Sequence, residues 1–357
     1  MAITRLEQND QPNRLLLISV PRTASNLLLK ILNIPNQPNV LTSPKGGYFF
    51  FDAFMAAGKE GRLNKPLSQW TDNDKTEVQN AFQISLDNLE AYSARARAEN
   101  KIMFAKEHAF WVTNPGVFTS MRDGSNKADD MKTFHVTTPD SYGAPTFSAH
   151  NDTILPDQYL RTWKLAFIIR HPALAWPSLY RAMQKISQAG YMDEDGIKGM
   201  GMANMSMSWT RQLFDWAMEQ PDVPSQPLVI DANDVIHNPA VVVRFCELAG
   251  LDTGSMQFEW GGNGVVEKKS ETWSADLASA GDAAEIKRQR SAAAIMLSTL
   301  EGSTGIVKDK APADVDVDVE VAKWKVEFGD EVAAVLEKAT RDAMDDYEYL
   351  KERRVTV

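Results

Sequence analysis

The sequence predicts an α/β protein with three layers, in which helices cover both faces of a central parallel sheet. Four short apolar runs lack polar alternation, as expected for strands buried on both faces. Helical patterns separate several of these runs, which is typical of parallel sheets. Polar or charged residues follow three of the runs, where ligand sites of such sheets lie. The predicted strands are residues 15–20, 102–105, 165–169 and 228–230.

The length allows one large α/β domain or two small ones, and we favour one, residues 1–357, with long inserts. The chain has 43% hydrophobic and 24% charged residues, which is enough for a sizeable core. Its net charge of −10 argues against broad binding to nucleic acids or anionic membranes, so an anionic ligand needs a local cluster of donors. One cysteine excludes an internal disulfide framework, and no Cys/His spacing resembles a zinc site, so we expect no metal.

The first residues, MAITRLEQNDQPNR, contain no apolar stretch long enough for a signal peptide or an anchor. We therefore expect a cytoplasmic protein that binds a small molecule, with no nucleic-acid or membrane partner. A homodimer stays open.

The first strand, expected to be central, runs into a helix through a turn at Pro21 and Arg22. Pro21 favours the turn, and Ser25 or Asn26 is expected to cap the helix. Backbone N–H groups at a helix N-terminus, one Arg and a few side-chain donors form a cradle for phosphate or sulfate. The glycine-rich nucleotide loops GxxxxGK[ST] and GxGxxG are absent, because the first glycine is Gly46.

The strand at residues 102–105 is followed by Lys106, Glu107 and His108. A neutral His accepts a proton from an alcohol, and a neighbouring Lys stabilises developing negative charge. Glu107 is the alternative base. Four further histidines are interpreted as structural: His135, His150, His171 and His237.

The strand at residues 165–169 ends at Arg170, and Ser178 lies eight residues on in the following helix. Because ligands bind at the carboxyl ends of parallel strands, Arg170 and Arg22 should face the same crevice. The alternative is that Arg170 merely pairs with a carboxylate at the strand end.

The other elements follow from periodicity and end signals. Two segments rich in turn residues or methionine are predicted as irregular, lid-like pieces, residues 112–160 and 189–207. The second is either an adaptable cover for a substrate or a surface loop. The stretch ADVDVDVEV is interpreted as an exposed connector or edge segment. Predicted helices are residues 72–99, 206–219, 238–248 and, closing the fold, about 330–351.

Three segments, in this order, resemble those of the sulfotransferases that use 3′-phosphoadenylyl sulfate (PAPS). VPRTASNLL is similar to the family's 5′-phosphosulfate loop, AKEHAF to its Lys-x-His segment, and RHPALAWPS to its 3′-phosphate signature. The strand, acidic turn and helix of PLVIDANDVIHNPAVVVRFCELAGL also match, so the resemblance extends from about residue 14 to 251. It implies the P-loop NTPase-like sulfotransferase architecture.

The resemblance implies a transferase that moves a sulfuryl group from PAPS to a hydroxyl or amine, releasing adenosine 3′,5′-bisphosphate (PAP). His108 takes the role of base, with Lys106 and Arg22 stabilising charge, and Arg22 and Arg170 are expected at opposite ends of one nucleotide. Ala24 stands where a Gly is common, and only residues 303–305 substitute for the family's RKG-type segment. The implied donor-binding residues are Arg22, Thr23, Ala24, Ser25, Asn26, Arg170 and Ser178.

Aromatic residues near these segments suggest a small hydrophobic acceptor, although such side chains also serve as core. They are residues 49–51, Phe54, Phe110 and Trp111. Two alternatives remain, because a fold does not determine a function. One is an enzyme of the same fold with cyclisation, elimination or another group transfer; the other is a non-catalytic nucleotide-binding protein.

Overall fold

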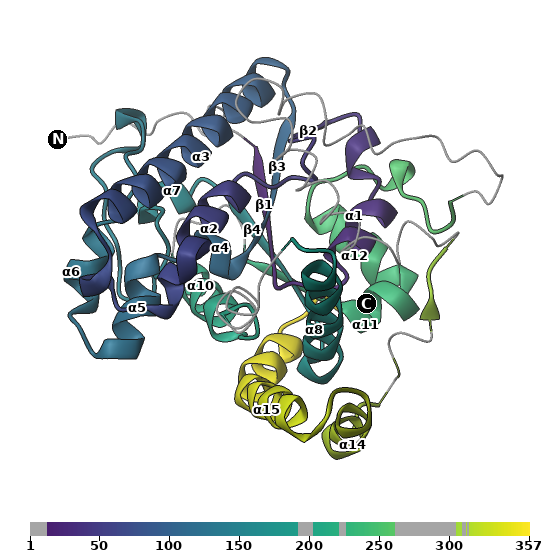
Figure 1. Cartoon of the computed structure of the whole chain (residues 1–357). Helices are drawn as coiled ribbons and strands as arrows, with labels where there is room; N and C mark the ends of the chain where they lie inside the picture. The colour runs from purple at the N-terminus through teal and green to yellow at the C-terminus, as the bar shows by residue number, and fades with distance from the viewer. Residues whose placement is uncertain (1–12, 192–202, 221–225, 261–304, 309–311, 313) are drawn as a thin grey trace.

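A computed structural model of the chain contains a five-stranded parallel sheet between two helical layers (Figure 1). The structure describes residues 13–191, 203–220, 226–260, 305–308, 312 and 314–357. All neighbouring strands are parallel, in the order β2-β3-β1-β4-β5. The predicted α/β class and the central position of the first strand are therefore confirmed. The strands are β1 Arg14–Ser19, β2 Val40–Thr42, β3 Ile102–His108, β4 Lys164–Ile169 and β5 Leu228–Asp231.

The sheet separates two hydrophobic cores, because successive side chains of a strand point to opposite faces. Leu16 and Ile18 of β1 belong to one core, whereas Leu15 and Leu17 belong to the other. Helices α1 (Ser25–Ile31), α11 (Ala232–His237) and α12 (Pro239–Leu248) cover the Leu15 side. The other side is covered by α2 (Phe51–Gly58), α3 (Asp72–Ala98), α8 (Pro172–Gln188), α10 (Ser208–Glu219) and α15 (Asp330–Glu352).

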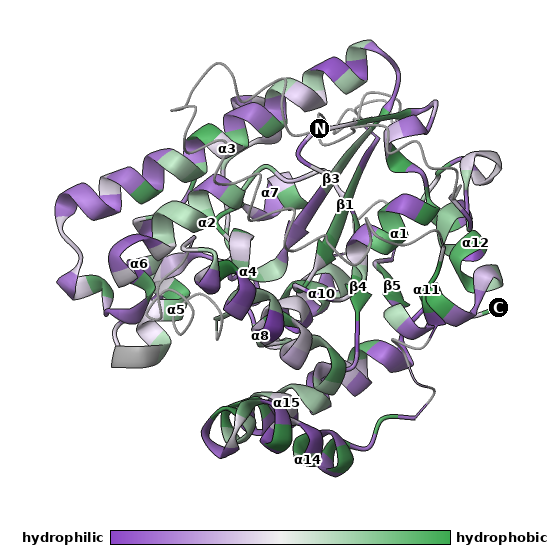
Figure 2. Cartoon of the chain, turned by 45° about the vertical axis from the view of Figure 1, so that its right-hand side comes forward, coloured by the Kyte–Doolittle hydropathy of each residue, from purple (hydrophilic) through white to green (hydrophobic). Residues whose placement is uncertain are grey.

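Four predicted helices match helices of the structure within two residues at each end: α3, α10, α12 and α15. The long helix α3 begins with a capping box, in which Asp74 N–H donates to the Thr71 hydroxyl and the Asp74 carboxylate accepts from Thr71 N–H. Figure 2 shows hydrophilic and hydrophobic residues alternating along α3, as expected for a helix with one face on the core. No helix among the described residues is long and apolar enough to cross a membrane.

The prediction that residues 112–160 are irregular is wrong for the parts that form short helices, whereas residues 143–156 are largely irregular, as predicted. The segment contains short helices, and several of its polar residues are buried and hydrogen-bonded, although residues 137–150 are mostly exposed. Asn114 caps one helix by accepting from Gly116 N–H, and Asn151 donates to Leu155 O. Asn-, Thr- and Pro-rich sequence therefore supplies caps and turns here. The helices of this region are α4 (Ala109–Val112), α5 (Pro115–Asp123), α6 (Lys127–Lys132) and α7 (Asp157–Leu160).

Two further predictions are tested only in part by the structure. The stretch ADVDVDVEV is partly helical, not a connector, because Asp316 accepts from Asp318 N–H and Val319 N–H and so caps helix α14 (Val317–Phe328). Helix α14 packs along α15 (Figure 2). Of the Met-rich segment, residues 192–202 lie outside the described residues, whereas Met205 and Met207 are buried.

Candidate functional site

The loop between β1 and α1 has a backbone suited to holding an anion. Arg22 and Ala24 both adopt left-handed conformations, with φ of 72° and 63°. Ala24 is the N-cap residue of α1 and no side chain caps the helix, so the predicted cap by Ser25 or Asn26 is wrong. The helix begins at Ser25, and the Asn26 amide is engaged with Lys106. Left-handed residues before an uncapped helix N-terminus direct backbone N–H groups into one concavity, as in anion-binding nests.

Thr23 stabilises this loop from inside. Its hydroxyl donates to the Val20 carbonyl at 2.8 Å, and its side chain is fully buried. The hydroxyl proton of Thr23 is therefore used in a hydrogen bond within the turn. Ser25 is also buried, whereas Ala24 and Asn26 are partly exposed on the loop.

Arg22, Arg170 and Ser178 lie together although they are far apart in the sequence. Arg22 Nε donates to Ser178 Oγ at 3.0 Å, and Arg170 Nη1 donates to the Arg22 carbonyl at 2.9 Å. Burial, with the nearby Arg22 charge, lowers the pKa of Arg170 to about 10, and burial also lowers the pKa of Arg22. Two crowded cations of this kind favour a bound anion, which relieves their repulsion. Arg22 therefore links the two, because its side chain contacts Ser178 and its backbone carbonyl contacts Arg170.

Strand β3 continues through Lys106, Glu107 and His108, three residues beyond its predicted end. Lys106 and His108 point to the α1 side of the sheet, because they alternate with Glu107 along the strand. Lys106 Nζ lies 2.5 Å from Asn26 Oδ1 and 4.2 Å from the centre of the Tyr48 ring. Burial lowers the pKa of Lys106 to about 7, so this amine responds strongly to a neighbouring negative charge.

The His108 imidazole is hydrogen-bonded at both nitrogens. Nδ1 lies 2.8 Å from Ser19 Oγ, its partner in the parallel register, and Nε2 lies 3.1 Å from the Tyr48 hydroxyl. Ser19 Oγ also donates to the Glu107 carbonyl at 3.2 Å. One tautomer satisfies all three contacts: Nδ1–H donates to Ser19, and Nε2 accepts from Tyr48. Burial and the Lys106 charge lower the pKa of His108 well below 6.5, so the ring is a neutral base at pH 7.

Glu107 has a structural position on the opposite face of the sheet. Its Oε1 accepts hydrogen bonds from Phe49 N–H and Phe50 N–H, at 2.6 and 3.1 Å, next to the N-terminus of α2. Burial raises the pKa of Glu107 to about 8. The backbone contacts explain why a carboxyl group occurs here, and they direct it away from the His108 side.

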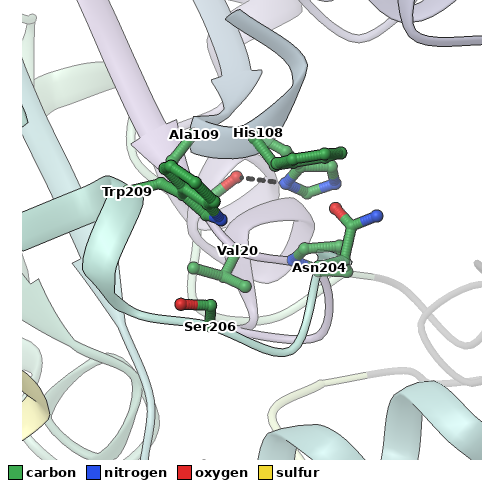
Figure 3. A pocket seen from close by; sticks show the side chains of 9 residues that line it. Val20, His108, Ala109, Asn204, Ser206 and Trp209 are labelled. Atoms are coloured by element: carbon green, nitrogen blue, oxygen red, sulfur yellow. Dashed lines mark hydrogen bonds between the residues drawn. The ribbon is translucent and has the colours of Figure 1, made fainter. Parts of the chain in front are cut away.

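A narrow pocket, too tight in this structure for a water molecule, lies beside His108 at the carboxyl end of β1 (Figure 3). Trp209 of α10 lines it, together with Val20 and with Ser206 and Asn204 from the segment before α10. Among the residues that the structure describes, the indole N–H of Trp209 has no hydrogen-bond partner, although it is buried. Pro21, Ala109 and Phe110 add apolar surface. The pocket therefore offers an apolar lining with one unsatisfied donor next to the neutral base.

The aromatic residues that the sequence suggested divide between core and site. Trp111 packs edge-on against His108 at 4.4 Å and stacks on Phe54. Phe110 lines the pocket. Residues 49 and 50 instead pack on Tyr92 and Phe82 of α3.

Sequence reasoning missed Ser19, Tyr48 and Trp209. Ser19 is the single polar residue of the first apolar run, and its position at the strand end is a usable signal. Tyr48 follows the pair Gly46-Gly47, a turn signal, but only tertiary structure brings it to His108. Trp209 gives no sequence signal that separates it from core tryptophans.

Three of the other histidines have structural contacts. His171 caps α8 by accepting from Ala173 N–H, His135 stacks on Phe147, and His150 pairs with Glu219. Residues 303 and 304 of the predicted RKG substitute lie outside the described residues. Among the described residues, no group of three or more His, Cys, Asp or Glu side chains is arranged to hold a metal ion.

Comparisons with known proteins give two close matches over nearly the whole chain. The chain is 33% identical over 356 residues to "Sulfotransferase ppzF" of Metarhizium majus (strain ARSEF 297), covering 97% of both proteins. It is 33% identical over 354 residues to the protein of that name from Metarhizium rileyi (strain RCEF 4871), again covering 97% of both. No family model matches the chain.

Two solved structures also match. The sulfotransferase domain of the Synechococcus PCC 7002 olefin synthase is 16% identical, with a TM-score of 0.34, over 90% of this chain and 97% of that domain. The sulfotransferase domain from the curacin biosynthetic pathway is 12% identical, with a TM-score of 0.38, over 88% of this chain and 97% of that domain.

Proposed function

This chain belongs to the sulfotransferases, and we propose that it moves a sulfuryl group from PAPS to a hydroxyl or amine of a small, mostly apolar acceptor. PAP is the second product. The observation that carries the proposal is the meeting of two clusters on one loop: Arg22 joins Ser178 and Arg170, while Asn26 joins Lys106 beside His108.

The donor fits the loop on chemical grounds. Its phosphate groups need several hydrogen-bond donors and positive charges, and the loop offers uncapped helix N–H groups beside Arg22 and Arg170. We assign Arg170 and Ser178 to the 3′-phosphate. We assign Arg22 to donor binding as well, because it contacts Ser178; a role for Arg22 in stabilising charge on the transferred sulfuryl group is the less favoured assignment.

His108 is the proposed base. Its neutral imidazole removes the proton from the acceptor's hydroxyl or amine as that oxygen or nitrogen forms a bond to sulfur. The bond between sulfur and the phosphate oxygen of the donor breaks, and PAP carries away the electron pair. Lys106, buried beside the base, stabilises the charge that develops on the leaving oxygen. Orientation and a preset field supply the remaining rate enhancement.

The pocket beside His108 is the proposed acceptor site. Apolar walls from Val20 and Phe110 favour a hydrophobic acceptor. The buried N–H of Trp209 favours one that also carries a hydrogen-bond acceptor, because an unsatisfied buried donor costs about 1–3 kcal/mol. The acidic net charge of −10 supports a small-molecule partner over nucleic acid or an anionic membrane.

Calorimetric titration with PAP tests the donor site. We expect wild type to bind PAP more tightly than adenosine 5′-phosphate. Arg170→Ala should weaken PAP binding roughly tenfold or more, because a charge-assisted hydrogen bond contributes about 1.5–3 kcal/mol. Arg181→Ala is the matched control, since Arg181 lies on helix α8, which follows Arg170, but pairs with Glu327 at the surface. Equal binding of PAP and adenosine 5′-phosphate, or no effect of Arg170→Ala, would reject the proposed site.

A further inference from the structure

Tyr48 is held beside His108 by two anchors on strand β3. On one side, the Gly47 carbonyl accepts from Lys106 N–H at 2.9 Å. Gly47 has φ of +91°, and a Cβ there would lie 3.1 Å from Lys106 N and 3.2 Å from Lys106 Cβ, so this contact requires glycine. On the other side, Phe49 N–H and Phe50 N–H donate to the Glu107 carboxyl. Tyr48 is therefore built into the site and is not a passing surface side chain.

The Tyr48 hydroxyl is hydrogen-bonded to Nε2 of His108, the nitrogen that would accept the proton. Its oxygen lies 3.1 Å from His108 Nε2, and the Ser19 contact assigns the ring proton to Nδ1. Burial, with the nearby Glu107, raises the pKa of Tyr48 well above 10, so the hydroxyl keeps its proton and donates to Nε2. In this state the lone pair of the base is already engaged.

Tyr48 also contacts the residue that links β3 to the donor loop. The Lys106 amine lies 4.2 Å from the Tyr48 ring and 2.5 Å from Asn26 Oδ1. A cation over an aromatic ring is attracted to it, so Lys106 holds the ring in place. Trp111 packs on the same ring with centroids 4.9 Å apart.

We propose that Tyr48 is a positioning residue that keeps His108 from activating water until an acceptor displaces the Tyr48 hydroxyl from Nε2. The inference rests on the proposed function. Without the hydrogen bond from Tyr48, water would attack sulfur and its proton would pass to His108 Nε2. The bond from sulfur to the phosphate oxygen would then break, giving sulfate and PAP. The hydrogen bond from Tyr48 removes the proton acceptor that this wasteful hydrolysis needs.

The test is hydrolysis of PAPS without any acceptor, measured as PAP and sulfate released by wild type and Tyr48→Phe. The phenylalanine variant keeps the ring on Trp111 and Lys106 but cannot donate to Nε2. We expect hydrolysis to rise about fivefold, the factor typical of one lost hydrogen bond, with unchanged PAP affinity. Adding His108→Ala should abolish the rise. Tyr180→Phe, whose ring packs on Phe328 away from the site, is the matched control.

Unchanged hydrolysis in Tyr48→Phe, or a rise that persists in the double variant, would overturn the inference. Nitrogen-15 NMR of His108 separates this outcome from failure of the proposed function, because it needs no donor. Wild type should show the Nδ1–H tautomer with a hydrogen-bonded Nε2, and Tyr48→Phe should shift the Nε2 signal. An unmoved signal would also overturn it, whereas absence of PAP binding in wild type would reject the proposed function alone.

Discussion

Arg22 Nε donates a hydrogen bond to Ser178 Oγ across 156 residues of sequence, at 3.0 Å. This contact joins the loop after β1 to helix α8, two segments that resemble separate parts of a donor site. Arg170 completes the cluster through the Arg22 carbonyl. A single local change in any of these residues should therefore affect donor binding, whereas the chemistry depends on residues of β3.

Replacing the proposed base should separate chemistry from binding. His108→Ala should lower kcat about 100- to 10,000-fold, the usual contribution of general base catalysis, while PAP affinity stays near that of wild type. Glu107→Gln keeps the acceptor oxygen for Phe49 N–H and Phe50 N–H and should retain most activity. Steady-state kinetics with PAP titrations on both variants make the measurement. The reverse pattern would make Glu107 the base.

The pH profile should have two limbs set by buried groups. The pKa of His108 is lowered well below 6.5, so the imidazole is still neutral and active at pH 6.5. Activity should be lost only when the pH falls through this lowered pKa. Lys106, with a pKa lowered to about 7, loses its charge as pH rises through about 7 in the free enzyme. We expect kcat/KM for PAPS to fall on the alkaline side from about pH 7, and Lys106→Met to be slower and to lack that limb. A flat profile of wild type between pH 6.5 and 9 would contradict the assignment.

Ala24 should carry backbone strain that glycine relieves. Its φ of 63° lies in the left-handed region, which costs a residue with a Cβ roughly 1–2 kcal/mol. Ala24→Gly should raise the free energy of unfolding by about 1 kcal/mol after the entropy of glycine in the unfolded chain is included. Urea denaturation measures the change. Gly46→Ala, at φ of 69° with open space around it, is the mirror control and should destabilise. A destabilised Ala24→Gly would show that the methyl group packs usefully.

Trp209 should select acceptors that carry a hydrogen-bond acceptor. We expect wild type to prefer 4-hydroxyacetophenone over 4-ethylphenol, which differ by a carbonyl in place of a methylene. Trp209→Phe keeps an aromatic wall but removes the indole N–H, so the preference in kcat/KM should shrink about five- to tenfold, the value of one neutral hydrogen bond. PAP affinity is the control and should not move. The same preference in wild type and Trp209→Phe would show that the indole N–H does not contact the acceptor.

Local sequence chemistry was enough to predict the sheet and much of the site. Uninterrupted apolar runs identified the four longer strands, because a strand covered on both faces excludes polar side chains. Arg22, Lys106, His108 and Arg170 were identified because polar residues at the carboxyl ends of parallel strands converge on one edge. The short strand β2 was missed, since three residues give no measurable periodicity.

Only the tertiary structure decided which of these residues touch. The partners of His108 come from a parallel neighbour, Ser19, and from a loop 60 residues upstream, Tyr48, and no spacing in the chain encodes either contact. The left-handed N-cap position of Ala24, the burial of Asn114 and Asn151 and the unpartnered buried N–H of Trp209 likewise depend on packing between distant segments. The physical reason is that sequence patterns determine which face of an element is apolar, whereas pKa, tautomer and hydrogen-bond partner depend on what the folded chain places a few ångströms away.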